Sequence, residues 1–142
     1  LQKNLPGDAL LASMIESNGI EMILGMTTDQ QLGPMITIGF GGYYAEALKD
    51  AVTLMPPFTA ETAKTAIKSL RMKSLLDGYR GTDPVDINAF AQMASVFSLI
   101  AIEFKEQISE IDINPVILGK DNCIAVDALI SLHQQKNKTE GE

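Results

Sequence analysis

The chain has 142 residues and a mass of 15.3 kDa, a length that corresponds to one domain. Hydrophobic residues make up 46% of it and charged residues 20%, so it can bury a core and a disordered chain is not expected. No apolar run reaches the roughly 20 residues of a membrane span, which excludes a transmembrane helix. The net charge of −7 argues against nucleic-acid binding, because that function needs clustered Lys and Arg.

The cysteine content and the two ends of the chain indicate its context. The single cysteine, Cys123, excludes a disulfide framework and a Cys-cluster metal site and fits a reducing compartment, so we expect a cytoplasmic protein. The chain begins at Leu1 rather than Met and ends in a polar run over residues 133–142, which we expect to be a disordered tail. We therefore expect residues 1–132 to be one folded piece of a longer protein.

Strands are predicted throughout the first third of the chain. Residues 9–17 and 20–28 are apolar runs separated by an Asn-Gly pair, the pattern that most strongly indicates a two-stranded hairpin. A third strand is expected over residues 35–40 and a fourth over about 44–54, each bounded by glycines or prolines. Residues 45–49 also have good helix propensity, so a helix is the alternative there.

Two helices are predicted in the middle of the chain. Thr59 is suited to cap a helix over about residues 60–70. Asp86 is suited to cap a second helix of about 19 residues, whose apolar residues recur at spacings of three and four. These residues are Ile87, Phe90, Ala94, Phe97, Ala101 and Phe104. Such a continuous apolar stripe predicts that this second helix packs on the core.

A hairpin is predicted near the C-terminus, with strands over residues 108–118 and 123–126 and a turn over 119–122. The order of elements is strands first, then two helices, then a hairpin. This order predicts an α+β fold with a mostly antiparallel sheet and about two helices on one face.

The C-terminal hairpin also carries a candidate metal site. Asp112 and Asn114 are two residues apart on one strand, so their side chains leave the same face of the sheet, and Asp127 ends the paired strand beside them. Carboxylate and amide oxygens are the hard ligands that Mg²⁺ prefers. The alternative is that Asp112 and Asn114 are the solvated face of an amphipathic strand.

Three other features have both a functional and a structural interpretation. The glycines of residues 39–42 would let backbone amides approach a phosphate, or they form a tight turn at a strand end. Arg80 is a phosphate or carboxylate clamp, or a surface arginine in a loop. A nucleophile triad built on His133 is not expected, and Cys123 in an apolar strand is expected to be a buried small hydrophobe.

Several short motifs occur in an order and spacing that is specific, although no single one is decisive. They are Gly19-Ile20-Glu21, Gly25-Met26, Leu32-Gly33-Pro34, Gly39-Phe40-Gly41-Gly42, Glu46 to Asp50, Leu76-Asp77-Gly78-Tyr79-Arg80-Gly81, Asp112-Ile113-Asn114-Pro115 and Val126-Asp127-Ala128. The succession resembles the C-terminal half of the ATP-grasp domain in ADP-forming (NDP-forming) acyl-CoA synthetases, relatives of the succinyl-CoA synthetase beta subunit. The resemblance covers about residues 8–130.

The resemblance implies an acid–CoA ligase that interconverts acyl-CoA, ADP and phosphate with the free acid, CoA and ATP through a phosphohistidine carried elsewhere. It implies that Asn114 and Asp127, with Asp112 beside them, are Mg²⁺ ligands in an ATP/ADP site. It places Glu21, Glu46 and Arg80 in the surroundings of that site. It also implies partners: the other ATP-grasp half, a CoA-binding and phosphohistidine domain or subunit, and an oligomer for the full enzyme.

The chain departs from the family pattern at two positions. Members commonly carry an arginine where Thr53 stands and often read Asp-Ala-Arg where Leu129 stands. Each departure removes a charge that would face a phosphate, so a catalytically degenerate scaffold or regulatory subdomain that docks a partner is one alternative. An unrelated small α+β binding module is another. Because the resemblance implies that the other ATP-grasp half is needed, we expect the isolated chain to be inactive.

Overall fold

One antiparallel sheet organises residues 19–42 and 47–134, the part of the chain that this computed structural model describes. Its strands are β1 (Ile20–Asp29), β2 (Gly33–Phe40), β3 (Ala51–Leu54), β4 (Ile108–Leu118), β5 (Cys123–Ala125) and β6 (Ala128–Leu132). They lie in the order β3-β2-β1-β4-β5, and β6 pairs with the first part of β4 while β5 pairs with its last residues.

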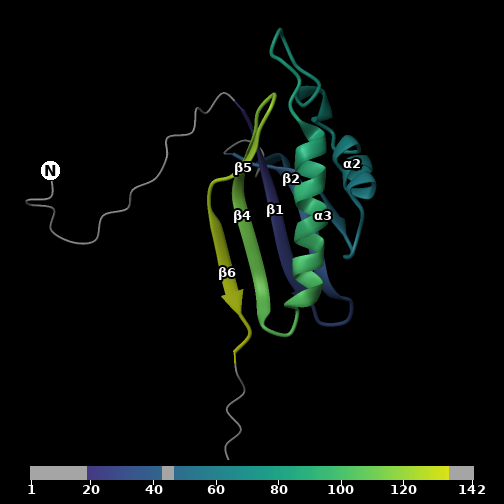
Figure 1. The fold of residues 1–142 in the computed structure, drawn as a ribbon, viewed down its shortest axis with the longest axis vertical. Helices are drawn as coiled ribbons and strands as arrows, with labels where there is room; N and C mark the ends of the chain where they lie inside the picture. The colour runs from purple at the N-terminus through teal and green to yellow at the C-terminus, as the bar shows by residue number, and fades with distance from the viewer. Residues whose placement is uncertain (1–18, 43–46, 135–142) are drawn as a thin grey trace, which may run out of the picture.

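Two helices, α2 (Ala60–Lys68) and α3 (Ile87–Glu103), lie side by side on one face of the sheet (Figure 1). A short 3₁₀ turn, η1 (Lys73–Leu75), lies between them in the chain. Both predicted N-caps are confirmed: the Thr59 hydroxyl accepts the N–H of Thr62 at 3.2 Å, and the Asp86 carboxylate accepts the N–H of Ala89 at 3.0 Å. The predicted α+β class, with helices on one face, is therefore confirmed.

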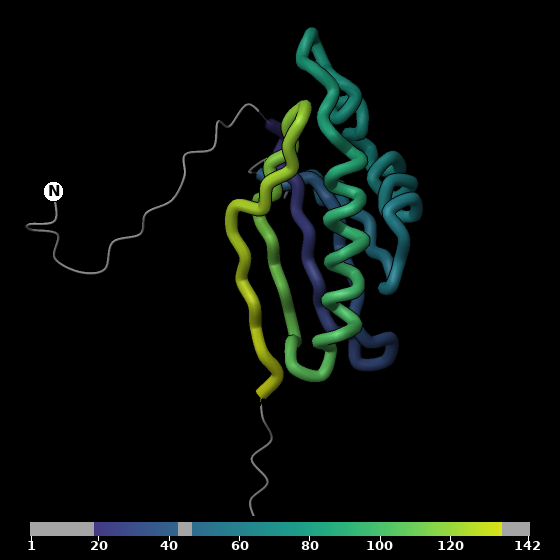
Figure 2. The backbone as a smooth tube through the Cα atoms, in the orientation of Figure 1, coloured from purple at the N-terminus to yellow at the C-terminus, as the bar shows by residue number. Residues whose placement is uncertain are grey.

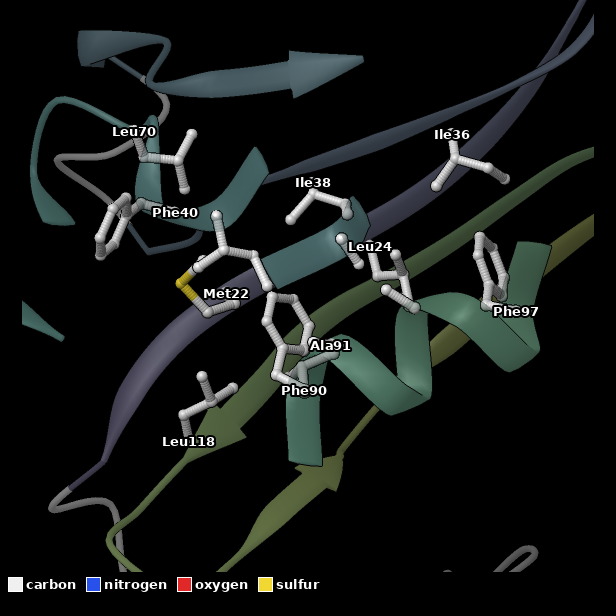
Figure 3. Close-up of a cluster of buried hydrophobic side chains, with 14 of the residues drawn as sticks. Met22, Leu24, Ile36, Ile38, Phe40, Leu70, Phe90, Ala91, Phe97 and Leu118 are labelled. Atoms are coloured by element: carbon white, nitrogen blue, oxygen red, sulfur yellow. The ribbon is translucent and has the colours of Figure 1, made fainter. Parts of the chain in front are cut away.

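The core lies between this helix layer and the sheet. Alternate residues of β1 and β2 point towards the helices, and Met22, Leu24 and Ile38 are fully buried there. Figure 3 shows these side chains meeting Phe90 and Phe97 of α3. The period of two in the strands and the spacing of three and four in α3 thus bury a common apolar layer. No helix in the described part of the chain has the length and apolar character that a membrane crossing requires.

The predicted first hairpin is not supported. Residues 9–17 lie outside the described residues, so their own structure is not assigned. Strand β1, however, already has a neighbour on each edge: β2 pairs with it from Met22 to Asp29, and β4 pairs with it from Ile20 to Thr27. A strand folded back through the Asn-Gly turn would need one of these edges, so its pairing with β1 is wrong.

Two other boundaries also differ from the prediction. The strand expected over residues 44–54 is shorter, because β3 begins at Ala51 and residues 47–48 are helical, in agreement with the alternative helix propensity. Strand β6 was not predicted at all, since the sequence interpretation ended the last strand near Asp127. The helix expected over residues 60–70 ends at Lys68, and the main helix has 17 residues rather than about 19.

Strand β4 contains a β-bulge that the sequence analysis did not anticipate. Leu24 pairs with Ile113 and Met22 pairs with Val116, so Ile23 of β1 faces two residues, Asn114 and Pro115. The extra residue reverses the alternation of β4. Val116 is consequently buried in the core, whereas strict alternation from Asp112 would have turned it to the other face.

Candidate functional site

Several of the predicted site residues lie on the face of the sheet that α2 and α3 do not cover. On β4, Ile111 is buried and Ile113 packs against the core under the helices, while Asp112 between them is exposed. On β1, Glu21 is exposed next to the fully buried Met22. Alternation along each strand therefore turns Asp112 and Glu21 to the helix-free face.

Asn114 of β4 lies opposite Asp127, which is in the short connection between β5 and β6. The N–H of Asn114 donates to the carbonyl of Asp127 at 3.2 Å, and the N–H of Val126 donates to the carbonyl of Pro115 at 3.0 Å. Residues directly opposite in an antiparallel pair have Cβ atoms about 4.5–5.5 Å apart. Asp127 also accepts the N–H of Ala128 through Oδ1 at 2.8 Å, which orients its carboxylate.

Asp112 lies one step further along the same strand. It pairs with Leu129 of β6 on one side and with Gly25 of β1 on the other. Gly25 has no side chain, so the sheet surface beside Asp112 is open. A Cβ at Gly25 would fit there, because the nearest atom, the Ile111 carbonyl oxygen, would be 3.7 Å away.

The donor set is compatible with a hard divalent cation but is not a closed protein cage. Within residues 19–42 and 47–134, no three His, Cys, Asp or Glu side chains gather in a group that could hold a metal ion. The oxygens available beside the bulge are those of an amide, Asn114, and of two carboxylates, Asp112 and Asp127. A cation such as Mg²⁺ typically takes one or two carboxylates and completes its coordination with water and substrate phosphates.

Glu21 lies beside the glycine-rich end of β2. Its backbone carbonyl accepts the N–H of Gly41 at 2.8 Å. Gly42 has a φ of +82°, and a Cβ added there would lie 3.0 Å from Oε2 of Glu21. The backbone conformation therefore favours glycine at this position, and the Glu21 carboxylate lies close to it. Glu46, the next predicted site residue, lies outside the described residues.

Arg80 lies in the loop between η1 and α3. Its guanidinium is stacked over the ring of Tyr79 at 5.3 Å from the ring centre, and its φ of +53° is rare for a residue with a side chain. Figure 2 shows this loop at the same end of the molecule as the β4–β5 hairpin, and an ion pair between Lys120 and Asp83 links the two. No hydrogen bond or ion pair in the described part of the chain joins Arg80 to Asn114 or Asp127.

Cys123 and His133 both make structural contacts. Cys123 is half-buried beside α3, where burial and then the Asp86 charge raise the pKa of its thiol to about 11. This agrees with the structural interpretation of the cysteine. His133 is tied to the α3–β4 connection, since its N–H donates to the Gln107 carbonyl at 2.9 Å and its Nε2 lies 3.2 Å from the Lys105 carbonyl.

Asp50 is an ionised and buried residue that the sequence analysis did not single out. Its carboxylate accepts the N–H of Arg71 at 3.0 Å and that of Met72 at 2.8 Å, and Nε of Arg71 lies 3.6 Å away. Burial opposes its ionisation, but the two N–H groups and the Arg71 charge outweigh burial and hold the pKa of Asp50 below its ordinary value. The only signal in the sequence is that this acidic residue directly precedes a short strand, β3.

Comparison with known proteins identifies the family of the chain. A family model described as an ATP-grasp domain matches residues 5–132. The beta subunit of an ADP-forming acetate–CoA ligase I from Pyrococcus furiosus is 41% identical over 114 residues, covering 80% of this chain and 49% of that protein. A 4-hydroxybutyrate–CoA ligase (ADP-forming) from Nitrosopumilus maritimus is 36% identical over 126 residues, covering 87% of this chain and 18% of that protein.

A solved structure has the same fold. The acetyl-coenzyme A synthetase 1 of Ca. Korarchaeum cryptofilum, in complex with coenzyme A and Mg-AMPPCP, superposes with a TM-score of 0.77 at 36% identity, over 81% of this chain and 54% of that one. The chain thus spans about half the length of the beta-subunit relative and of this structure. From the family match over nearly its whole length, together with these relatives, the chain belongs to the ATP-grasp family and is similar to ADP-forming acid–CoA ligases.

Proposed function

We propose that this chain forms one wall of the Mg²⁺–nucleotide site of an ADP-forming acid–CoA ligase. The complete enzyme would interconvert acyl-CoA, ADP and phosphate with the free acid, CoA and ATP. The observation that carries the proposal is the opposition of Asn114, on β4, and Asp127, in the β5–β6 connection, at a sheet whose other face is closed by helices. The ligase names of the relatives and the Mg-AMPPCP bound by the structural neighbour support it.

In this proposal Asn114 and Asp127 hold Mg²⁺, and Asp112 lies beside them. The ion would neutralise phosphate charge during phosphoryl transfer, for which the protein mainly supplies position and electrostatics. A chain of net charge −7 would otherwise repel a nucleotide, so a cation between these oxygens and the phosphates is the simplest way to bind one here. Glu21, Glu46 and Arg80 are proposed to border the site.

The rest of the enzyme is proposed to lie outside this chain. The other ATP-grasp half would close the nucleotide site from the helix-free face, and a CoA-binding part would carry the phosphohistidine. One of the neighbouring structures is described with its phosphohistidine segment pointing towards the nucleotide site. His133 is not proposed for this role, because its ring is engaged with the Lys105 carbonyl.

The metal assignment is tested in the full-length protein with Asn114→Ala and Asp127→Ala. We expect each change to raise the Mg²⁺ concentration for half-maximal ATP formation from acetyl-CoA, ADP and phosphate at least tenfold, because one oxygen ligand is lost. Asp121→Ala is the matched control, since Asp121 is an exposed acid on the β4–β5 turn. Unchanged Mg²⁺ dependence in both variants, with folded circular dichroism spectra, would contradict the assignment.

The 142-residue chain by itself should have no turnover and only weak affinity for Mg-ADP, since it supplies one wall of the site. Isothermal titration calorimetry measures this directly. Micromolar binding of Mg-ADP to the isolated chain would contradict the division of the site between two halves.

A catalytically degenerate scaffold is the second candidate, and Leu129 favours it. This residue is 66% exposed and pairs with Asp112, so an apolar side chain stands where the family resemblance implies an arginine. If the chemistry has decayed, Leu129→Arg should raise the ligase rate of the full-length protein. Leu132→Arg, on the same strand and 68% exposed, is the control and should leave the rate unchanged.

A further inference from the structure

Gly25 lies in the interior of β1, the middle strand of the order β3-β2-β1-β4-β5. It pairs with Thr37 of β2 on one side and with Asp112 of β4 on the other. Glycine weakens the interior of a strand, because it has no side chain to pack and loses the most conformational freedom on folding. A glycine at the centre of this sheet therefore calls for a physical reason.

The structure supplies such a reason for the other glycines of residues 19–42 and 47–134. Four of them have a positive φ, and four would bring a Cβ to 3.3 Å or less from a neighbouring atom. The first group is Gly33, Gly42, Gly78 and Gly81, and the second is Gly19, Gly39, Gly41 and Gly119. Gly25 belongs to neither group: its φ is not positive, and the nearest described atom to an added Cβ is the Ile111 carbonyl oxygen, at 3.7 Å.

The β-bulge of β4 does not explain this glycine either. The extra residue of the bulge is on β4 and lies opposite Ile23, whereas Gly25 is in regular register with both of its neighbouring strands. A glycine inside a strand, when it does not mark a bulge or a bend, marks a point that a ligand or another backbone approaches closely. Nothing in the described part of the chain approaches Gly25 in this way, so we infer that the approaching group comes from outside these residues.

The surroundings of Gly25 indicate what kind of group this is. Leu24 and Met26 are fully buried under the helices, so Gly25 faces the helix-free side, as Asp112 does. Thr37 shares this face, because its neighbours Ile36 and Ile38 are also fully buried. Strands lie about 4.8 Å apart, so the Thr37 hydroxyl and the Asp112 carboxylate border a gap about 10 Å wide that holds no side chain.

We propose that a phosphoryl group of the Mg²⁺-bound nucleotide lies over Gly25, and that the missing side chain makes room for it. This inference rests on the proposed function. Mg²⁺ binds oxygens at about 2.0–2.1 Å, so a phosphoryl group on an ion beside Asp112 lies within about one strand spacing of that carboxylate. On one side of Asp112 the position is filled by Leu129, and on the other side it is the empty position of Gly25. The Thr37 hydroxyl borders the same gap and can donate a hydrogen bond to a phosphoryl oxygen.

Titration calorimetry of the full-length protein with Mg-ADP tests this placement. Gly25→Ala should raise the dissociation constant of Mg-ADP at least tenfold, because the new methyl group occupies the space of the phosphoryl group. Thr37→Val, which keeps the shape of the side chain and removes the hydroxyl, should raise it as well. Ser131→Thr is the matched control: it adds one methyl group on the same face, two strands away from Gly25, and should leave the dissociation constant unchanged.

Urea unfolding of the same proteins without nucleotide gives a readout that is independent of binding. The unfolding midpoint of Gly25→Ala should equal or exceed that of the parent protein, since the added Cβ meets no described atom closer than 3.7 Å and alanine restricts the unfolded chain. A lowered midpoint together with an unchanged dissociation constant would overturn the proposal and show that another backbone, not the nucleotide, rests on Gly25.

The Asn114→Ala variant separates this inference from the proposed function. If Asn114→Ala binds Mg-ADP more weakly while Gly25→Ala and Thr37→Val bind it as the parent protein does, the placement of the phosphoryl group is overturned and the nucleotide site stands. If all three variants bind Mg-ADP as the parent protein does, the proposed function fails and this inference fails with it.

Discussion

Replacement of Asp50 by Asn should lower the free energy of unfolding of this chain by about 2–4 kcal/mol. The Asp50 carboxylate is buried and accepts two backbone N–H groups at the corner between α2 and η1, from Arg71 and Met72. Asn keeps one acceptor oxygen and presents an NH₂ group to the second N–H. Loss of a hydrogen bond to a charged group removes about 1.5–3 kcal/mol, and an unpaired buried donor costs about 1–3 kcal/mol.

The pH dependence gives this prediction a second, independent readout. The folded-state pKa of Asp50 lies below its ordinary value of 3.8. Its contribution to stability is therefore complete above the unfolded-state pKa and is lost as the pH falls below about 3.8 towards the folded-state pKa. The free energy of unfolding of the parent chain should fall over this pH range. That of the Asp50→Asn variant should fall less, because Asn does not titrate.

Urea unfolding followed by circular dichroism, at pH 7 and through the acid range, measures both effects. Asp83→Asn is the matched control. Asp83 pairs with Lys120 at 3.3 Å, but both side chains are mostly exposed, so its replacement should cost less than about 1 kcal/mol. If the two Asp→Asn variants unfold at the same urea concentration, the assignment of Asp50 as the stabilising carboxylate is refuted.

Three further predictions concern residues in or beside the two helices. Ser98→Ala removes the acceptor of the Phe58 N–H and should cost about 1–3 kcal/mol in urea unfolding, whereas the exposed Ser74→Ala should change stability by less than about 0.5 kcal/mol. Thr59→Ala removes the cap of α2 and should cost about 0.5–2 kcal/mol by the same measurement. Cys123, whose pKa is about 11, should react with iodoacetamide at pH 8 about a hundredfold more slowly in the folded chain than in urea.

Local patterns were sufficient to predict β1, α3 and the two helix caps. Alternation in β1 and the stripe of α3 are both strong because one face of each is fully buried, as at Met22 and Phe90. The caps at Thr59 and Asp86 depend on a few neighbouring residues only, so they could also be predicted. The glycine at position 42 was recognised, but its contact with Glu21 needs the tertiary structure.

Pairing between distant segments is what the sequence could not determine. The Asn-Gly signal before β1 is local, whereas the actual neighbours of β1 are β2 and β4, of which β4 begins 79 residues after β1 ends. Strand β6 was missed for the same reason: the run Ala128–Leu132 becomes a strand because β4 offers it an edge. Asp50 was missed because its partners, Arg71 and Met72, are 21 and 22 residues away.

The bulge in β4 changes which residues of the strand point towards the helices. Before it, Ile111 is buried under the helices and Asp112 is turned away from them; after it, Val116 and Leu118 belong to the core under the helices. The positions packed under the helices thus change from odd to even numbers across Asn114, and an unbroken strand could not bury both sets. The sequence does not reveal this change, because residues 116–118 are all apolar. The surroundings of Asn114, a proposed metal ligand, are therefore set by a tertiary feature, the bulge of β4 against β1, which the Asp-x-Asn spacing does not reveal.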